Sequence, residues 1–517
     1  MPESGAFKRL ISIDEVNSTL PPDALTAVTL LYIALPNLIF LGGWLKLPYA
    51  VIAIPLLLVS LWQFARTQLL QWRQPYSLSA LLLIVVIGFV WCSLGGAGHF
   101  GFTNPDWIVR DTVLGDLTLA DWPPYYSTTD GFPHILRTAF GFFFPPALAG
   151  KWLGMGALDV SAYVWEAFGA CLFLLLLPLP RQTGKLLLLT LIVAIMFSGM
   201  DYLGIILLTG TTPLFPLRLE WWVPFSYPSL TGQMYWAPNH ALPLWLVTTL
   251  FYRHWGHRCL ASLMIILLPL LMIWTPFAVA AIMPFVGIAM LRWLNSNNKL
   301  SHFGVTLIQF ITAALLTYLT VRLLTLSITA IPGAPTIEVA PNKDRFVLKY
   351  LLFALMEFAV LGLLLARALR HSQGLFWLAF AILALLPLYQ YGPSNDTMLR
   401  LSTPCLVIFL ILTINLIRDW ATLPCWRALP DTAWMVAIVL VIGFCTPFNE
   451  IWRAATFHRT PPNYGVSLVE HERGEPPHYV GVLDKPDLLL MLREPGRVPD
   501  RNERKAQGVL PVFSEAR

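Results

Sequence analysis

The sequence predicts an all-α fold, a polytopic bundle of about 13 membrane-spanning helices (range about 11–14), and three observations lead to it. Of the 517 residues, 56% are hydrophobic and only 12% are charged, which is about half the charge of ordinary soluble domains. The mean hydropathy is +0.65. Apolar runs of span length recur along the chain, and the loops between them alternate in basic content. This composition excludes a soluble enzyme, a disordered chain and a disulfide-rich secreted module.

The apolar runs locate the individual spans. A break at Trp274-Thr275-Pro276 divides the long run 259–291, because proline removes a helix hydrogen bond. The segment 139–156 is apolar but contains Pro145, Pro146 and Lys151, which indicates an interfacial or re-entrant segment. The predicted spans are 24–44, 48–65, 77–97, 158–179, 185–208, 238–252, 259–274, 276–291, 303–328, 347–366, 373–391, 401–417 and 432–450.

Charge placement orients these spans. Six short loops carry twelve Lys and Arg against two acids; they are 66–76, 180–185, 253–258, 292–300, 367–372 and 418–431. Four loops on the other side carry six Lys and Arg against nine acids; they are 98–138, 209–237, 329–346 and 392–400. This is the positive-inside pattern.

The pattern divides the chain into three parts. It predicts a cytoplasmic N-terminal segment 1–23, a transmembrane domain 24–451 whose four acidic loops are periplasmic, and a polar, proline-rich tail 452–517 on the periplasmic side. Within the tail, HYVGVLDKPDLLLMLREP is expected to be ordered. The charge of +5 contains no basic run, which speaks against a nucleic-acid partner.

The first outer loop holds the strongest local pattern. Pro105 is suited to a helix start, with Asn104 as its N-cap. On this helix Asp106 and Arg110 share a face, because they are four residues apart. A carboxylate near a helix N-terminus at the mouth of the membrane domain can act as a general base toward a sugar or lipid hydroxyl, or hold a divalent metal. The same acids also fit a solvated interfacial helix.

The motifs of this loop resemble the GT-C superfamily of polytopic glycosyltransferases, which use polyprenyl-phosphate-linked sugars. The similar motifs are Asp106-Trp107, Asp111, Leu114-Gly115-Asp116-Leu117 and Trp122-Pro123, followed by FFFPPALAGKWLG (142–154), FSGMDYLG (197–204) and NDTMLRLSTP (395–404). The resemblance covers most of the membrane domain. The loop is similar to the corresponding loop of uncharacterised bacterial members of the superfamily. The resemblance departs in one respect: the acidic loop follows the third predicted span, whereas in the superfamily it usually follows the first.

The resemblance implies an activity and its machinery. The first outer loop would supply the catalytic acid position, with Asp106 the first candidate, Asp111 the second and Asp116 the third. The partners would be a polyprenyl-phosphate-sugar donor, membrane lipids, and a lipid, glycan or protein acceptor. Transfer would be an inverting displacement at the periplasmic face of a bacterial inner membrane, within the cell envelope. No cofactor is certain, although a divalent metal is compatible.

Two further regions provide candidate substrate contacts. Asn395, Asp396 and Arg400 lie where a span begins, and the guanidinium of Arg400 matches a lipid phosphate bidentately. An Asp396–Arg400 pair that only caps a helix is the alternative. Lys343 and Arg345 are additional phosphate candidates, or else solvated charges.

The loop 209–238 and the preceding span contribute the remaining candidates. Its residues Arg218, Glu220 and Trp222 accompany several aromatic side chains that can stack on sugar rings or populate the membrane interface. His240 lies at a helix start in a structural or a catalytic role. Asp201 interrupts the run 185–208, and an ionisable group in a span is a functional hypothesis. The alternative is a buried acid that pairs with a base or a hydroxyl of an outer loop.

Two other functions remain open from the sequence. A lipid-linked glycan polymerase or ligase has a similar span count but depends less on an acidic first loop. A transporter or flippase needs polar residues along several spans, whereas the predicted spans contain few acids, among them Asp201 and Glu357.

Overall fold

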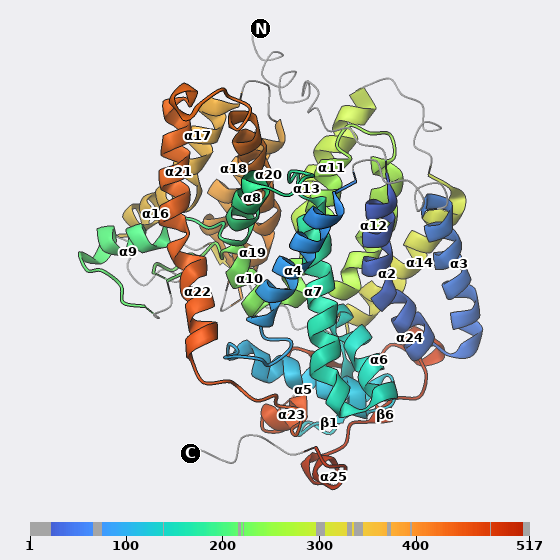
Figure 1. Cartoon of the computed structure of the whole chain (residues 1–517). Coiled ribbons are helices and arrows are strands. Elements are labelled where there is room, and N and C mark those ends of the chain that lie inside the picture. The colour runs from blue at the N-terminus through green and yellow to red at the C-terminus, as the bar shows by residue number, and fades with distance from the viewer. Residues whose placement is uncertain are drawn as a thin grey trace.

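The computed structural model describes residues 22–65, 75–137, 139–215, 219–220, 222–295, 305–327, 333–335, 345–369, 374–392, 395–475 and 477–509. Most of these residues are helical. The long helices run side by side, and the elements of the first outer loop and of the tail gather at one end of them, the lower end in Figure 1.

The helices of the bundle lie within or beside the predicted spans, and several of them are shorter than predicted. They are α2 (Ala24–Trp44), α3 (Leu47–Ala65), α4 (Leu78–Ser93), α7 (Leu158–Leu176), α8 (Lys185–Ile195), α11 (Pro238–Arg253), α12 (Leu260–Trp274), α13 (Pro276–Asn295), α14 (Leu307–Leu324), α16 (Phe346–Ala354), the π-helical turn η5 (Leu355–Ala359), α17 (Val360–Ala368), α18 (Gly374–Leu385), α20 (Thr403–Trp420) and α21 (Asp431–Gly443). The predicted break at Thr275 is confirmed, since α12 ends at Trp274 and α13 begins at Pro276.

Seven helical segments of the described chain are long and apolar enough to cross a membrane, and five shorter apolar helices accompany them. Large apolar side chains are exposed on the outside of the bundle, among them Ile52, Val90, Phe310 and Val441. Such a surface is stable against lipid and unfavourable in water. These features indicate a membrane protein.

One predicted span is two helices. The run 185–208 is interrupted after α8, and a second helix, α9 (Asp201–Thr209), begins at Asp201. The expectation that Asp201 lies in the middle of one continuous span is therefore wrong. Hydropathy did not reveal the interruption because the residues between the helices, such as Met196 and Phe197, are themselves apolar.

The first outer loop and the tail form one layer. The loop contributes α5 (Asp106–Leu119), β1 (Pro124–Ser127), β2 (Pro133–Leu136), η1 (Gly141–Phe143) and α6 (Phe144–Leu153); the tail contributes α23 (Leu468–His471), β5 (Val480–Val482), α24 (Pro486–Met491), β6 (Gly496–Arg497) and α25 (Arg501–Ala506). Strands from both join in one sheet of order β5-β2-β1-β6. The segment expected to be ordered in the tail forms β5 and α24.

The helix α5 differs from the interfacial helix expected in this loop. It packs against α6 and α23, and nearly all of its side chains from Asp111 to Thr118 are buried. The helix begins at Asp106 with Pro105 in the N-cap position, so Asn104 is not the cap. The side chain of Asn104 instead accepts a hydrogen bond from Arg453. The α6 helix has ten residues, about 15 Å at 1.5 Å per residue, which is too short for a span.

Further short elements lie between the long helices in sequence or after the last of them. They are α10 (Leu230–Trp236), the two-stranded sheet of β3 (Gly333–Pro335) and β4 (Tyr389–Tyr391), α19 (Asp396–Leu401) and α22 (Cys445–Thr456).

Candidate functional site

A cavity of about 1130 Å³ lies where the outer layer meets the bundle. Its lining comes from segments far apart in the sequence: α5, α11, α19, α22 and the tail all contribute. Five predicted site residues line it, namely Asp106, Glu220, His240, Asp396 and Arg400. Charged groups together with an apolar wall in one concave site are typical of a ligand-binding pocket.

Asp106 provides the exposed carboxylate of this cavity. It is the first residue of α5, and its side chain is 48% exposed. Its Oδ2 is 3.4 Å from Nη2 of Arg110, one helical turn later. The carboxylate thus lies at the N-terminal end of the helix, beside a guanidinium and at the wall of the cavity. From this position it is accessible to a hydroxyl that enters the cavity.

Two arginines bring positive charge to the cavity, and each has a buried nitrogen without a hydrogen-bond partner among the described residues. Arg110 donates from Nε to Asn239 at 3.4 Å, while its buried Nη1 has no partner among the described residues. Arg400 is 3.7 Å from Asp396, and its buried Nε likewise has no partner in the described part of the chain. Buried unpaired donors are costly, so these two side chains are suited to an anionic ligand that would satisfy them.

Two carboxyl groups lie on the same lining. Glu220 accepts hydrogen bonds from the backbone nitrogen and the hydroxyl of Ser229. Glu450 accepts from Nε1 of Trp236 and pairs with Arg453 at 2.9 Å. Burial, together with the neighbouring Glu450, raises the pKa of Glu220 to about 8. Glu450 was not a candidate from the sequence, because it lies at the end of an apolar run with no motif around it.

His240 also faces the cavity, from the first turn of α11. Its Nδ1 forms a hydrogen bond of 2.8 Å with Oγ1 of Thr275, and its ring meets that of Phe277 edge to face. These contacts fix the ring orientation and leave Nε2 for a ligand.

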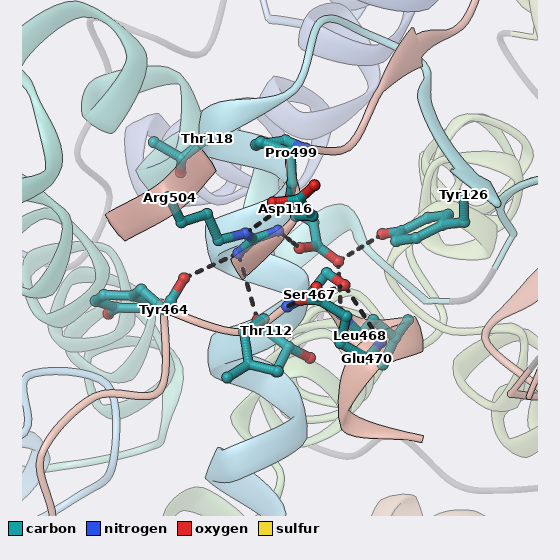
Figure 2. Close-up of polar contacts among 12 residues, drawn as sticks. Thr112, Asp116, Thr118, Tyr126, Tyr464, Ser467, Leu468, Glu470, Pro499 and Arg504 are labelled. Carbon is teal, nitrogen blue, oxygen red and sulfur yellow. Dashed lines mark hydrogen bonds and ion pairs between the residues drawn. The ribbon is translucent and has the colours of Figure 1, made fainter. Parts of the chain in front are cut away.

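The second candidate acid, Asp111, is buried away from the cavity lining. Its Oδ2 is 3.1 Å from Nε2 of His99 and accepts a hydrogen bond from the backbone nitrogen of Asn463. The third, Asp116, is fully buried against Arg504, Tyr126 and Leu468 of the tail and loop, as Figure 2 shows. Both acids hold the outer layer together. Their placement favours Asp106 as the base, and the assignment itself stays a prediction.

Asp201 and Trp222 meet each other outside the cavity lining. Trp222 donates from Nε1 to Asp201 at 3.0 Å, and Thr446 donates to the other oxygen at 2.8 Å. Asp201 is therefore a buried, paired acid, but its partners are the indole of Trp222 and a hydroxyl of α22 instead of a base or hydroxyl of an outer loop.

The remaining residues that were predicted to contact a substrate do not line the cavity or lie outside the described residues. Asn395 is buried beside the cavity and accepts from the backbone nitrogen of Tyr391. Arg345 is exposed next to the start of α16 and does not line the cavity. Arg218 and Lys343 lie outside the described residues.

The tail and the end of β2 supply lining residues that the sequence did not indicate. Arg137, His478 and Tyr479 all face the cavity. Because the tail follows the last span by many residues, no local pattern could have assigned it to the same site as Asp106.

His99 bridges two acids beneath the site and should make stability depend on pH. Its fully buried ring lies 3.1 Å from Asp111 and 3.2 Å from Asp159. Burial alone would lower the pKa of His99, but the two hydrogen-bonded carboxylates raise it from 6.5 to about 9. A shift of this size corresponds to about 3 kcal/mol. This contribution is complete below pH 6.5, where both states are protonated, and is lost as the pH rises through 9.

Thermal unfolding between pH 6 and pH 10 measures this effect. The wild-type protein should exceed the His99→Gln variant in stability most strongly below pH 6.5, and the difference should vanish above pH 9. A difference that is constant across this range would contradict the charged bridge.

No group of three or more His, Cys, Asp or Glu residues in the described parts of the chain is arranged to hold a metal ion.

Comparisons with known proteins identify no relative: no family model matches this chain, no curated protein matches it, and no solved structure matches it.

Proposed function

We propose that the protein is a membrane glycosyltransferase of GT-C type, which moves a sugar from a polyprenyl-phosphate carrier to a lipid, glycan or protein acceptor. One observation carries the proposal: a single cavity at the end of the bundle combines the exposed carboxylate of Asp106 with two guanidinium groups, Arg110 and Arg400, that have unpaired donors. A base and an anion-binding pair are the two groups that this transfer needs.

The reaction would be an inverting displacement, as the resemblance implies. The acceptor oxygen attacks the anomeric carbon, the bond from that carbon to the phosphate oxygen breaks, and the acceptor proton passes to Asp106. The polyprenyl phosphate leaves as an anion, and Arg400 and Arg110 stabilise its developing charge. Because a phosphate is a stable leaving group, no acid is required on that side.

The proposal includes a topology. About 13 spans, with the N-terminal segment in the cytoplasm of a bacterium, place the cavity and the tail at the periplasmic face of the inner membrane. The basic loops support this orientation, and Arg253 and Arg181 lie among them. A carrier lipid held in the membrane would present its phosphate at the depth where α19 meets α20, which is where Arg400 lies.

Binding of a polyprenyl phosphate to the purified full-length protein tests the proposal. Replacing Arg400 with Ala should weaken binding by about 10- to 100-fold, the effect of losing a charge-assisted hydrogen bond of about 1.5–3 kcal/mol. Arg400→Lys should recover only part of the loss, because an ammonium cannot donate in the bidentate geometry.

The matched control is Arg427→Ala, which removes an exposed arginine of the loop 418–431, far from the cavity lining. Its affinity should equal that of the wild-type protein. Equal affinity of the Arg400→Ala variant would contradict the assignment of the phosphate site. Movement of the glycolipid across proteoliposomes without a covalent product would favour a flippase instead.

A further inference from the structure

The tail reaches the cavity through one short segment. Strand β5 pairs antiparallel with β2 of the first outer loop, in the register Ile135 with Gly481. The two residues immediately before β5, namely His478 and Tyr479, line the cavity. The C-terminal part of the chain therefore contributes directly to the wall of a site that is otherwise built from the loop and the bundle.

This segment is held firmly in place. Arg137 holds it by two hydrogen bonds: its backbone nitrogen donates to the carbonyl of Tyr479 at 2.9 Å, and its Nε donates to the carbonyl of Val480 at 2.8 Å. Its Nη1 donates to the carbonyl of Leu324 on α14 at 3.3 Å. Arg137 thus ties the tail both to the loop and to the outer end of α14. A wall fixed in this way is preorganised for a ligand.

The side chain of Tyr479 lines the cavity together with the charged residues of the site. Its ring is close to that of His478, with 4.0 Å between the ring centres. Arg110, Asp106, Asp396 and Arg400 all act on it electrostatically. Its hydroxyl makes no hydrogen bond to any residue that the structure describes. A tyrosine hydroxyl on a cavity wall can form hydrogen bonds with the hydroxyl groups of a sugar. The aromatic face beside it can pack against the apolar face of the sugar ring.

We propose that Tyr479 and His478 bind the sugar that is transferred, so that the tail forms the sugar-recognising wall of the site. The inference rests on the proposed function, which places the carrier phosphate on Arg110 and Arg400 and the acceptor hydroxyl on Asp106. The sugar must lie between these groups, because its anomeric carbon joins the phosphate and receives the acceptor oxygen. Tyr479 is the aromatic side chain that borders this space from the side of the tail.

A comparison of two probes tests the assignment. The first probe is a polyprenyl phosphate. The second is a panel of the same lipid in which each member carries one hexose or one pentose. Both are measured with the purified full-length protein. The wild-type protein should bind at least one glycosylated lipid more tightly than the bare phosphate. Tyr479→Phe should weaken binding of that lipid by about 5- to 10-fold, the effect of one hydrogen bond, and leave binding of the bare phosphate unchanged. Tyr479→Ala and His478→Ala should lower the same preference further.

Matched controls separate recognition from folding. Tyr49→Phe and His471→Ala change an exposed tyrosine on α3 and an exposed histidine on α23, neither of which lines the cavity; both should keep the wild-type preference. Each variant should also melt at the wild-type temperature.

Two outcomes would overturn the inference while the proposed function stands. One is a wild-type protein that binds the bare phosphate and every glycosylated lipid equally. The other is a Tyr479→Phe variant that retains the full preference. If the wild-type protein binds neither probe, the proposed function itself fails.

Discussion

Replacing Asp106 with Asn should abolish sugar transfer while the protein folds normally. An amide of the same shape cannot accept the proton of the acceptor hydroxyl, so the rate should fall by about 10²- to 10⁴-fold. The carboxylate is half exposed and has Arg110 as its ion-pair partner, so the change should cost no more than about 1 kcal/mol of stability. The measurements are the rate of transfer from a polyprenyl-phosphate-sugar, binding of the carrier phosphate, and thermal unfolding.

Two other acids of the same loop serve as controls. Asp121→Asn removes an exposed carboxylate that does not line the cavity, and it should keep wild-type activity. Asp111→Asn should lower thermal stability, because it removes the negative charge that pairs with His99, and any remaining folded protein should be active. Full activity of the Asp106→Asn variant would remove the catalytic assignment.

The sequence predicts the bundle well because its signal is local. Apolar runs, proline positions and the Lys and Arg bias each depend on a few neighbouring residues, and they place the helices in the right parts of the chain, although α8, α18 and α21 end earlier than predicted. The break between α8 and α9 escapes this reasoning, because apolar residues fill the interruption and hydropathy reports composition rather than backbone conformation. Asp201 was therefore assigned to a continuous span instead of to the start of a short helix.

The candidate site could be predicted only in part. Asp106, His240 and Arg400 were found because each lies at the start of a predicted helix, where polar groups in an apolar chain stand out. Tyr479 and Arg137 carry no such mark, since they reach the cavity through strands of three or four residues whose pairing joins the loop to the tail. Pairings of that kind are specified by complementary packing over the whole chain, which no local pattern records.

Breaking the ion pair between Arg504 and Asp116 should strongly destabilise the contact between the tail and the loop. Both side chains are fully buried. The guanidinium also donates to the carbonyls of Pro499 at 2.9 Å and Tyr464 at 2.8 Å, and the carboxylate accepts from Tyr126 at 2.9 Å (Figure 2). Replacing Arg504 with Met would leave the Asp116 charge buried without its cation. Removal of one partner of a buried pair costs about 3–5 kcal/mol.

This loss should release the tail, because Arg504 belongs to α25 and its partner lies 388 residues earlier on α5. Limited proteolysis should then cleave the tail faster in Arg504→Met than in the wild-type protein, and thermal unfolding should begin at a lower temperature. The control is Arg497→Met, which removes an exposed tail arginine paired with Glu503 and should change stability by no more than about 0.5 kcal/mol.

A double variant separates charge burial from loss of contact. Asp116→Leu combined with Arg504→Met replaces both buried charges by apolar side chains, and such exchanges recover much of the stability that the single change loses. Because the tail carries Tyr479 to the cavity, the single variant should also lose the preference for glycosylated lipid, and the double variant should regain it as the tail docks again. If the Arg504→Met variant resists the protease as well as the wild-type protein does, the tail is held without this ion pair, by the pairing of β5 with β2 and of β6 with β1.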